Sequence, residues 1–184
     1  MKKSGIIIAL SGPSGVGKDT IIDLITSKLN FIRFPSCTTR EKRPDEVDGV
    51  HYNFINRENF NEFWKNGDLL ECYIVCGHNY GLNISELNKK LNCGQNIITH
   101  LSLEGVFVLK KSITEVITVF IMPPSQKAVI NRLQKRGVSE EELSIRTNLK
   151  LITLEDIYTC DLVVVNHENE AQQVAERIIG FVFK

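Results

Sequence analysis

A glycine-rich segment near the start of the chain has the composition and spacing of a phosphate-binding loop. It reads Gly12-Pro13-Ser14-Gly15-Val16-Gly17-Lys18, which fits the pattern GxxxxGK between a predicted strand and a predicted helix. Glycines allow successive backbone N–H groups to turn toward phosphate oxygens, and the start of the helix adds partial positive charge. Lys18 adds a full charge, so the segment predicts a site for the phosphates of a nucleotide.

The residue after this lysine departs from the usual pattern, in which a serine or threonine hydroxyl binds Mg²⁺. Asp19 takes that place and is followed by Thr20. A carboxylate is a good ligand for Mg²⁺, although it also brings negative charge close to the phosphates of the nucleotide. Asp19 is therefore either a metal ligand or an acidic residue that satisfies backbone donors in the first turn of the helix. We expect the metal role, with Mg²⁺ as the cofactor.

A second group of polar residues could bind a phosphate monoester. The segment Ser36-Cys37-Thr38-Thr39-Arg40-Glu41-Lys42-Arg43-Pro44 leads to Asp48-Gly49-Val50-His51-Tyr52. Arg40 and Arg43 would supply planar N–H donors, and Tyr52 and Tyr80 would supply phenolic hydroxyls. The alternative for the two arginines is an ordinary solvated basic loop.

A third group of residues lies on predicted helices in the second half of the chain. Ser125 begins a helical pattern in which Arg132 and Arg136 are four residues apart and therefore on one face. Arg146 follows in the next helical pattern. These arginines could neutralise a transferring phosphoryl group, and the alternative is an exposed helix surface without a site.

The elements that must position these residues alternate between strands and helices, which is typical of a parallel sheet covered by helices. Apolar runs predict buried strands at Ile6–Leu10, Asn96–Thr99, Val116–Ile121 and Leu162–Val165. Helical patterns cover 20–29, the segment from Ser125 to before Gly137, the segment that begins at Ser139, and Ala171–Ile179.

The segment from about residue 34 to residue 91 has a different character from the rest of the chain. Short strand-like pieces, His51–Phe54 and Leu69–Val75, lie on either side of the helical pattern Arg57–Lys65. We expect an insertion at the carboxyl edge of the sheet, where open α/β folds bind their ligands.

Length and composition exclude several classes of protein. The chain has 184 residues, 42% hydrophobic and 24% charged, which predicts about one globular domain rather than a disordered, collagenous or disulfide-stapled chain. Its 22 basic and 22 acidic side chains argue against a nucleic-acid or lipid-surface protein held by its overall charge. No segment approaches the roughly 20 apolar residues of a membrane helix. We therefore expect a cytoplasmic protein without nucleic-acid or membrane partners.

In combination these motifs resemble those of the guanylate kinase family. The resemblance rests on the glycine-rich loop, the S-x-T-T-R-x-x-R-P run and the later Gly77-His78-Asn79-Tyr80-Gly81, and it extends from Gly5 to about Asn166. It implies an α/β fold of the P-loop NTP hydrolase type, with a parallel sheet flanked by helices. One domain of residues 1–184 would comprise a core (about 1–34, 92–124 and 148–184), an acceptor-binding subdomain (about 35–91) and a helical lid (about 125–147).

The resemblance also implies substrates and roles. ATP would phosphorylate GMP, with dGMP as a further acceptor, and Lys18, Arg132, Arg136 and Arg146 would stabilise the transferring group. Arg40, Arg43, Tyr52 and Tyr80 would hold the phosphate of the acceptor, while Ser36 and Glu71 would bind the guanine edge. The ATP site would be formed by Gly12, Pro13, Ser14, Gly15, Val16, Gly17, Lys18, Asp19, Thr20 and Asn166.

Besides Asp19, three positions depart from the family pattern. His100 and Ser102 stand where the family has acids, and Leu82 stands where it has a small hydroxyl residue. We expect His100 to be a structural histidine at the end of a strand. The Lys18–Asp19 pair resembles that of ribose 1,5-bisphosphate phosphokinase, which gives an alternative activity. A binding module that has lost catalysis is a second alternative, although the retained phosphate-binding lysine and arginines argue against it.

Overall fold

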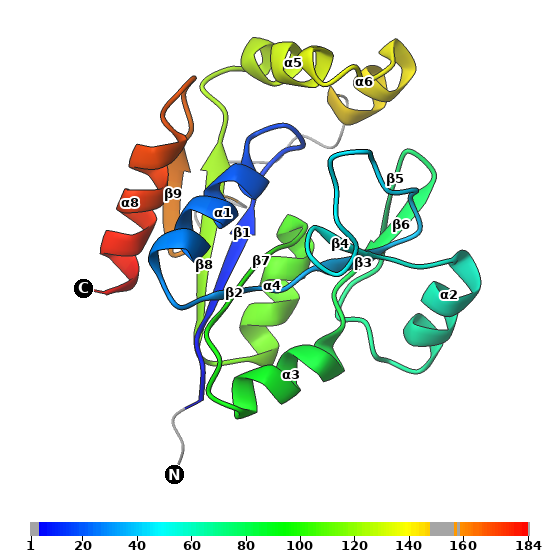
Figure 1. Ribbon diagram of the computed structural model, residues 1–184, viewed down its shortest axis with the longest axis vertical. Coiled ribbons are helices and arrows are strands. Elements are labelled where there is room, and N and C mark those ends of the chain that lie inside the picture. The colour runs from blue at the N-terminus through cyan, green and yellow to red at the C-terminus, as the bar shows by residue number, and fades with distance from the viewer. Residues whose placement is uncertain (1–3, 148–156, 158, 184) are drawn as a thin grey trace.

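The computed structural model describes residues 4–147, 157 and 159–183 (Figure 1). Five parallel strands form a central sheet in the order β2-β7-β1-β8-β9. Their bounds are β1 Ile7–Ser11, β2 Ile32–Arg33, β7 Ile97–His100, β8 Val116–Met122 and β9 Leu162–Val165. Every residue of β1 and β7 is buried, as runs that are apolar on both faces require. The predicted parallel sheet is confirmed.

Helices cover both faces of this sheet. On one face, α1 (Lys18–Lys28) and α8 (Ala171–Val182) pack apolar side chains such as Ile21 and Ile178 against Ile8. On the other face, α3 (Ile84–Asn92) and α4 (Leu103–Ser112) contribute to a second cluster that contains Ile7 and Ala9. Burial of these faces is the main source of stability of the core, and it holds the carboxyl ends of the strands in a fixed arrangement.

A smaller sheet stands beside the carboxyl ends of the central strands (Figure 1). It has the order β4-β3-β6-β5 and is accompanied by α2 (Arg57–Lys65), whose Phe60 is fully buried with Cys37 and Leu69. The strands are β3 Ser36–Thr38, β4 Tyr52–Phe54, β5 Tyr73–Val75 and β6 His78–Gly81. This sheet lies within the segment that the sequence predicted as an insertion.

Two further helices, α5 (Gln126–Lys135) and α6 (Glu140–Thr147), lie beyond the carboxyl ends of the central strands (Figure 1). The predicted helix starts are confirmed by capping bonds. The Ser125 hydroxyl accepts from the backbone N–H of Ala128, and the Ser139 hydroxyl accepts from that of Glu142, each at 3.2 Å. These helices occupy the position of the predicted lid.

The patterns did not predict α3 and α4. Each begins with a side-chain cap: Asn83 accepts from the backbone N–H of Glu86, and Ser102 accepts from that of Gly105, both at 2.9 Å. Such caps are typical of helix starts. Because α3 packs Leu87 into the core of the central sheet, the second sheet and its helix occupy a shorter segment than the predicted 35–91.

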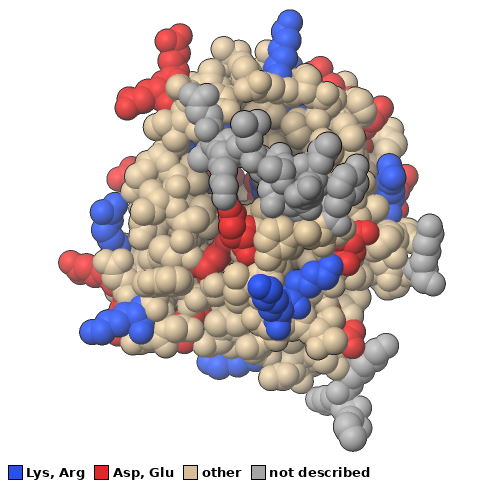
Figure 2. Space-filling model, turned by 180° about the vertical axis from the view of Figure 1, so that it is seen from behind, with Lys and Arg blue, Asp and Glu red and all other residues tan. Residues whose placement is uncertain are grey.

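The surface agrees with the balanced composition. On the face shown in Figure 2, acidic and basic side chains are interspersed among uncharged residues. None of the described helices has both the length and the apolar character needed to cross a membrane.

Candidate active site

The glycine-rich loop connects β1 to α1, as the sequence predicted. Gly12 has φ +140°, and a Cβ there would lie 2.3 Å from the carbonyl oxygen of Ile121. Gly17 has φ +101°, and a Cβ there would lie 2.7 Å from Nδ2 of Asn166. Backbone conformation and close packing both require glycine at these positions. The loop therefore brings its backbone close to β8 and to the end of β9.

Lys18 is held at this loop. Its Nζ donates to the carbonyl oxygens of Gly12 at 2.6 Å and Pro13 at 3.1 Å. Burial lowers the pKa of Lys18 to about 8; Asp19 opposes this shift, while Arg136 and Arg146 add to it. An ammonium with a pKa near 8 still carries its charge over most of the population at pH 7, so Lys18 can serve as the predicted phosphate ligand.

Asp19 forms an ion pair that the sequence did not indicate. Its carboxylate accepts from Arg33 on β2, and Arg33 also pairs with Asp23 at 2.8 Å. Burial alone would raise the pKa of Asp19, but His100, Arg33 and Lys18 together lower it. The carboxylate is therefore ionised, and its side chain remains 42% exposed. Asp19 lies in the first turn of α1, after the N-cap residue Gly17, and its carboxylate bonds to Arg33.

These donors fit a metal ion that is carried mainly by the nucleotide. Within the described residues, no three His, Cys, Asp or Glu side chains are grouped closely enough to hold a metal. Mg²⁺ commonly uses only one or two carboxylates, together with substrate phosphates and waters. Asp19, half-buried and next to Lys18, can supply one such carboxylate.

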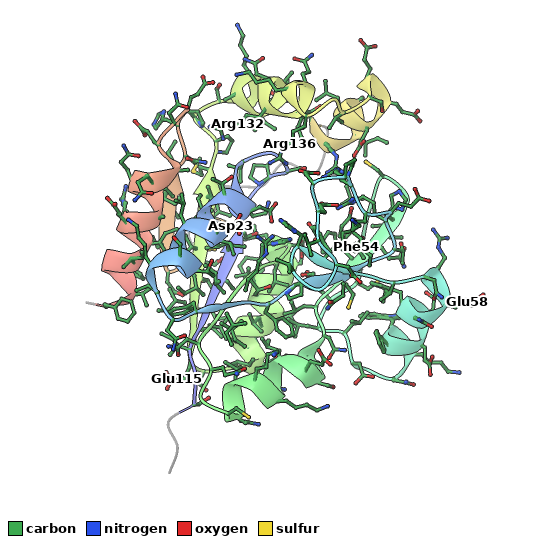
Figure 3. All side chains as sticks on the ribbon, in the orientation of Figure 1. Asp23, Phe54, Glu58, Glu115, Arg132 and Arg136 are labelled. Atoms are coloured by element: carbon green, nitrogen blue, oxygen red, sulfur yellow. The ribbon has the colours of Figure 1, made fainter. Side chains whose placement is uncertain are left out.

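The three predicted lid arginines have different surroundings. Arg132 donates to the carbonyl oxygens of Val16 at 3.1 Å and Asn166 at 2.8 Å, and Arg146 donates to Oγ of Ser14 at 2.8 Å. Arg136 is exposed at the end of α5, and in Figure 3 Arg132 and Arg136 lie on the side of α5 nearer α1. The structure thus brings all three close to the glycine-rich loop, with Arg132 and Arg146 bonded to it.

Asn166 is buried where β9 meets the glycine-rich loop. Its Nδ2 donates to the carbonyl oxygen of Val16 at 2.7 Å. Its Oδ1 is fully buried and has no partner within the part of the chain that the structure describes. Asn166 therefore fixes the loop and leaves one acceptor that a donor on a ligand can satisfy.

Arg40 is positioned by a carboxylate that the sequence interpretation missed. Glu46 accepts from both terminal nitrogens of Arg40, at 2.7 and 2.9 Å, and from the backbone N–H of Arg43 at 2.8 Å. Burial opposes ionisation of Glu46, but its bonds with Arg40 and Arg43 lower its pKa. This contact could have been predicted, because Glu46 is an acidic residue three positions after Arg43. At that spacing its side chain can reach back to the backbone of the turn.

Aromatic rings surround this arginine. The guanidinium of Arg40 lies 5.4 Å from the ring centre of Tyr52 and 5.5 Å from that of Phe54. Tyr80 lies 5.9 Å from Tyr52 and is stacked on Tyr73, which the sequence did not single out, at 5.3 Å. The predicted arginine and both predicted tyrosines therefore meet on the smaller sheet.

Glu71 is buried against the start of α4. Its Oε2 accepts from the hydroxyl of Ser102 at 2.5 Å, while its Oε1 is buried and has no partner among the described residues. A Cβ at Gly105 would lie only 2.0 Å from Oε2. Burial raises the pKa of Glu71 to about 7, against the bonds from Ser102 that lower it. An orphaned acceptor in a buried site needs a donor from elsewhere.

Ser36 and Leu82 are both buried, Ser36 at 2% exposure and Leu82 completely. The Ser36 hydroxyl donates to the carbonyl oxygen of His100 at 3.3 Å. Ser36, predicted to contact the guanine edge, thus also ties β3 to β7, and Leu82 packs into the core of the central sheet.

A glycine-rich loop with its lysine, nearby arginines of two helices and a separate arginine–tyrosine cluster are the features expected of an ATP-dependent kinase of nucleoside monophosphates. Comparison with known proteins agrees. The family model "Guanylate kinase" matches residues 4–179, and the chain belongs to the guanylate kinase family.

Relatives support the match over most of the chain. A guanylate kinase of Carboxydothermus hydrogenoformans is 39% identical over 85% of this chain and 76% of its own. One from Onion yellows phytoplasma is 35% identical over 99% of this chain and 87% of its own. The crystal structure of guanylate kinase from Anaplasma phagocytophilum superposes with a TM-score of 0.75 at 27% identity, covering 99% of this chain and 86% of that one.

Proposed function

We propose that the chain transfers the γ-phosphoryl group of ATP to GMP, and also to dGMP, giving ADP and the nucleoside diphosphate. The observation that carries this proposal is the pairing of two features in the acceptor half of the site. Arg40, Tyr52 and Tyr80 are gathered for a phosphate. Glu71 comes just before Tyr73, which stacks on Tyr80, and its buried Oε1 has no partner among the described residues.

The base is selected by hydrogen bonding to Glu71. Guanine presents two donors on one edge, N1–H and the exocyclic amine, whereas adenine presents an acceptor at N1. A carboxylate oxygen that lacks a partner gains a bond with guanine and meets a lone pair with adenine. Buried polar groups left unpaired make such discrimination large.

The transfer itself needs alignment and charge stabilisation rather than a general base. The nucleophile is a phosphate oxygen of GMP, which is already ionised near neutral pH. Lys18 would bind the phosphates of ATP, and Arg136 and Arg146 would neutralise the charge that develops on the transferring group. Arg132 donates to the carbonyl oxygen of Val16. We assign to Arg132 the role of holding the lid against the glycine-rich loop.

Asp19 would hold Mg²⁺ together with the phosphates of ATP. The bound ion would neutralise phosphate charge and orient the γ-phosphoryl group. In the chain alone, Arg33 balances the charge of Asp19. The carboxylate is exposed enough to exchange part of this contact for the metal.

One assay distinguishes the proposed activity from the two alternatives, a ribose 1,5-bisphosphate phosphokinase and a binding module without catalysis. Rates of ADP release from ATP are measured with GMP, dGMP, AMP, UMP and ribose 1,5-bisphosphate at the same concentration. We expect GMP and dGMP to be the best acceptors. A preference for ribose 1,5-bisphosphate would identify the alternative kinase, and no ADP release with any acceptor would identify a binding module.

A further inference from the structure

His100 ends a strand, as expected of a structural histidine, and its side chain also contacts one of the residues proposed to bind the acceptor phosphate. It ends β7 and is only 6% exposed. Its Nε2 is 3.0 Å from the phenolic oxygen of Tyr52, and the two rings meet edge-on with centres 5.3 Å apart. This contact connects the central sheet to the smaller sheet directly behind a proposed phosphate ligand.

The backbone of His100 is fixed from two sides. In the central sheet His100 is in register with Leu10 of β1. The hydroxyl of Ser36 on β3 donates to the carbonyl oxygen of His100. The imidazole is therefore presented to Tyr52 from a rigid position.

The hydroxyl of Tyr52 has only one proton to donate. A phosphate dianion has only acceptors, so Tyr52 binds it well only when that proton is free. Burial raises the pKa of Tyr52, which keeps the hydroxyl protonated. The direction of the bond between Tyr52 and His100 therefore decides whether Tyr52 can serve the phosphate.

The neutral imidazole of His100 carries one N–H. Burial is the main cause that lowers the pKa of His100 to about 4, with Lys18 and Arg33 adding to the effect and Asp19 opposing it. If the proton were on Nδ1, Nε2 would accept the proton of Tyr52, and Tyr52 would present lone pairs to the phosphate. If the proton is on Nε2, His100 donates to Tyr52 and leaves the tyrosine proton free.

We propose that His100 is a positioning residue for the acceptor phosphate: its Nε2–H donates to the Tyr52 hydroxyl and so directs the proton of Tyr52 toward the phosphate. This inference rests on the proposed function and deepens it, since it assigns the phosphate contact to a pair, Tyr52 and His100.

The test compares binding of GMP with binding of guanosine, which has the same base and no phosphate. Titration calorimetry without ATP or Mg²⁺ excludes any effect through the metal. We expect His100→Phe to weaken GMP binding roughly tenfold, the size of one hydrogen bond to a charged group, and to change guanosine binding less than twofold. His100→Gln keeps an N–H donor and should restore most of the affinity for GMP.

Tyr52→Phe supplies the matched background. With the hydroxyl removed, His100→Phe should have no further effect on GMP binding. Equal losses for GMP and guanosine, or an undiminished loss in the Tyr52→Phe background, would show that His100 is only structural. Failure of the unaltered protein to bind GMP would instead overturn the proposed function.

A spectroscopic measurement keeps the proposal testable if His100→Phe does not fold. In the unaltered protein labelled with ¹⁵N-histidine, nitrogen chemical shifts report which ring nitrogen carries the proton. His100 should be protonated at Nε2 at pH 7. A proton on Nδ1 would overturn the proposal.

Discussion

Glu46 accepts hydrogen bonds from both terminal nitrogens of Arg40, at 2.7 and 2.9 Å. Both side chains are almost fully buried, at 9% and 11% exposure. A buried bidentate pair of this kind holds a guanidinium in one plane. Arg40 is therefore placed before any phosphate arrives, and its arrangement depends on a residue that need not touch the substrate.

The first prediction separates these two residues. Arg40→Ala removes a charged phosphate ligand and should cost about 2–5 kcal/mol in kcat/KM for GMP. Glu46→Gln keeps the shape but weakens the hold on Arg40, so KM for GMP should rise about tenfold while kcat changes little. Steady-state kinetics with varied GMP at saturating ATP measure both effects.

Glu41→Gln is the control, because Glu41 lies in the same loop and its side chain is exposed. It should leave KM for GMP unchanged. An equal effect of Glu41→Gln and Glu46→Gln would mean that the loop responds to net charge alone. Wild-type kcat/KM in Arg40→Ala would show that this loop does not bind the acceptor.

The second prediction concerns the dependence of stability on pH. Burial raises the pKa of Glu71 from its ordinary value of 4.5 to about 7, so the folded chain keeps a proton that the unfolded chain has already lost. The contribution of Glu71 to the free energy of unfolding is therefore fully favourable below about pH 4.5 and declines as pH rises to about 7. The decline amounts to about 3 kcal/mol.

Urea unfolding of the chain and of Glu71→Gln at pH 5 and pH 8 measures this effect. The amide has no charge to lose, so the variant should gain stability relative to the unaltered chain as the pH rises. A difference between the two proteins that is the same at both pH values would mean that Glu71 titrates normally.

The third prediction concerns selection of the base. Ser102 donates to Oε2 of Glu71, so the proposed contact with guanine belongs to Oε1, which has no partner among the described residues. Glu71→Gln places donors where the base also has donors, so the ratio of kcat/KM for GMP to that for AMP should narrow sharply. Ser102→Gly should narrow it by a smaller factor, because the carboxylate remains but loses its fixed orientation.

Glycine is chosen at position 102 because Ser102 also caps α4 through the backbone N–H of Gly105. Replacing a capping serine with glycine costs only a few tenths of a kcal/mol, whereas alanine costs about 1 kcal/mol. An unchanged ratio for GMP over AMP in Glu71→Gln would place base recognition elsewhere in the site.

The fourth prediction tests the metal. Asp19→Asn should raise the Mg²⁺ concentration for half-maximal activity several-fold at fixed ATP, because one carboxylate ligand is lost. Asp23→Asn is the matched control, since Asp23 also pairs with Arg33 but lies a turn further along α1. If the two variants give superimposable Mg²⁺ titrations, the effect belongs to Arg33 and the metal role of Asp19 is wrong.

The sequence predicted β1, β7, β8 and β9 closely because a buried parallel strand must be apolar on both faces, whereas β2, which has two residues and lies at the edge of the sheet, was not predicted. The predicted strand Leu162–Val165 is β9, and the predicted helix Arg57–Lys65 is α2. The glycine-rich loop was also predictable from residue type. Gly12 and Gly17 have no room for a side chain, so the fold requires glycine at both positions.

Side-chain pairings across the fold were not predictable from local patterns. The ion pair of Asp19 could not be predicted from its neighbours on α1, because its partner Arg33 lies on β2. His100 does end a strand, as expected, but its contact with Tyr52 was not predictable because Tyr52 is 48 positions away on another sheet. In both cases the partner is brought in by tertiary packing.

The central claim is most directly tested by following phosphorus from ATP into product. ATP labelled with ³²P at the γ-position is incubated with GMP, Mg²⁺ and the chain, and the nucleotides are separated by thin-layer chromatography. The account predicts that the label appears in the β-phosphate of GDP, and that Arg40→Ala and Glu71→Gln slow its appearance. Label released only as inorganic phosphate, or transferred equally well to AMP, would contradict it.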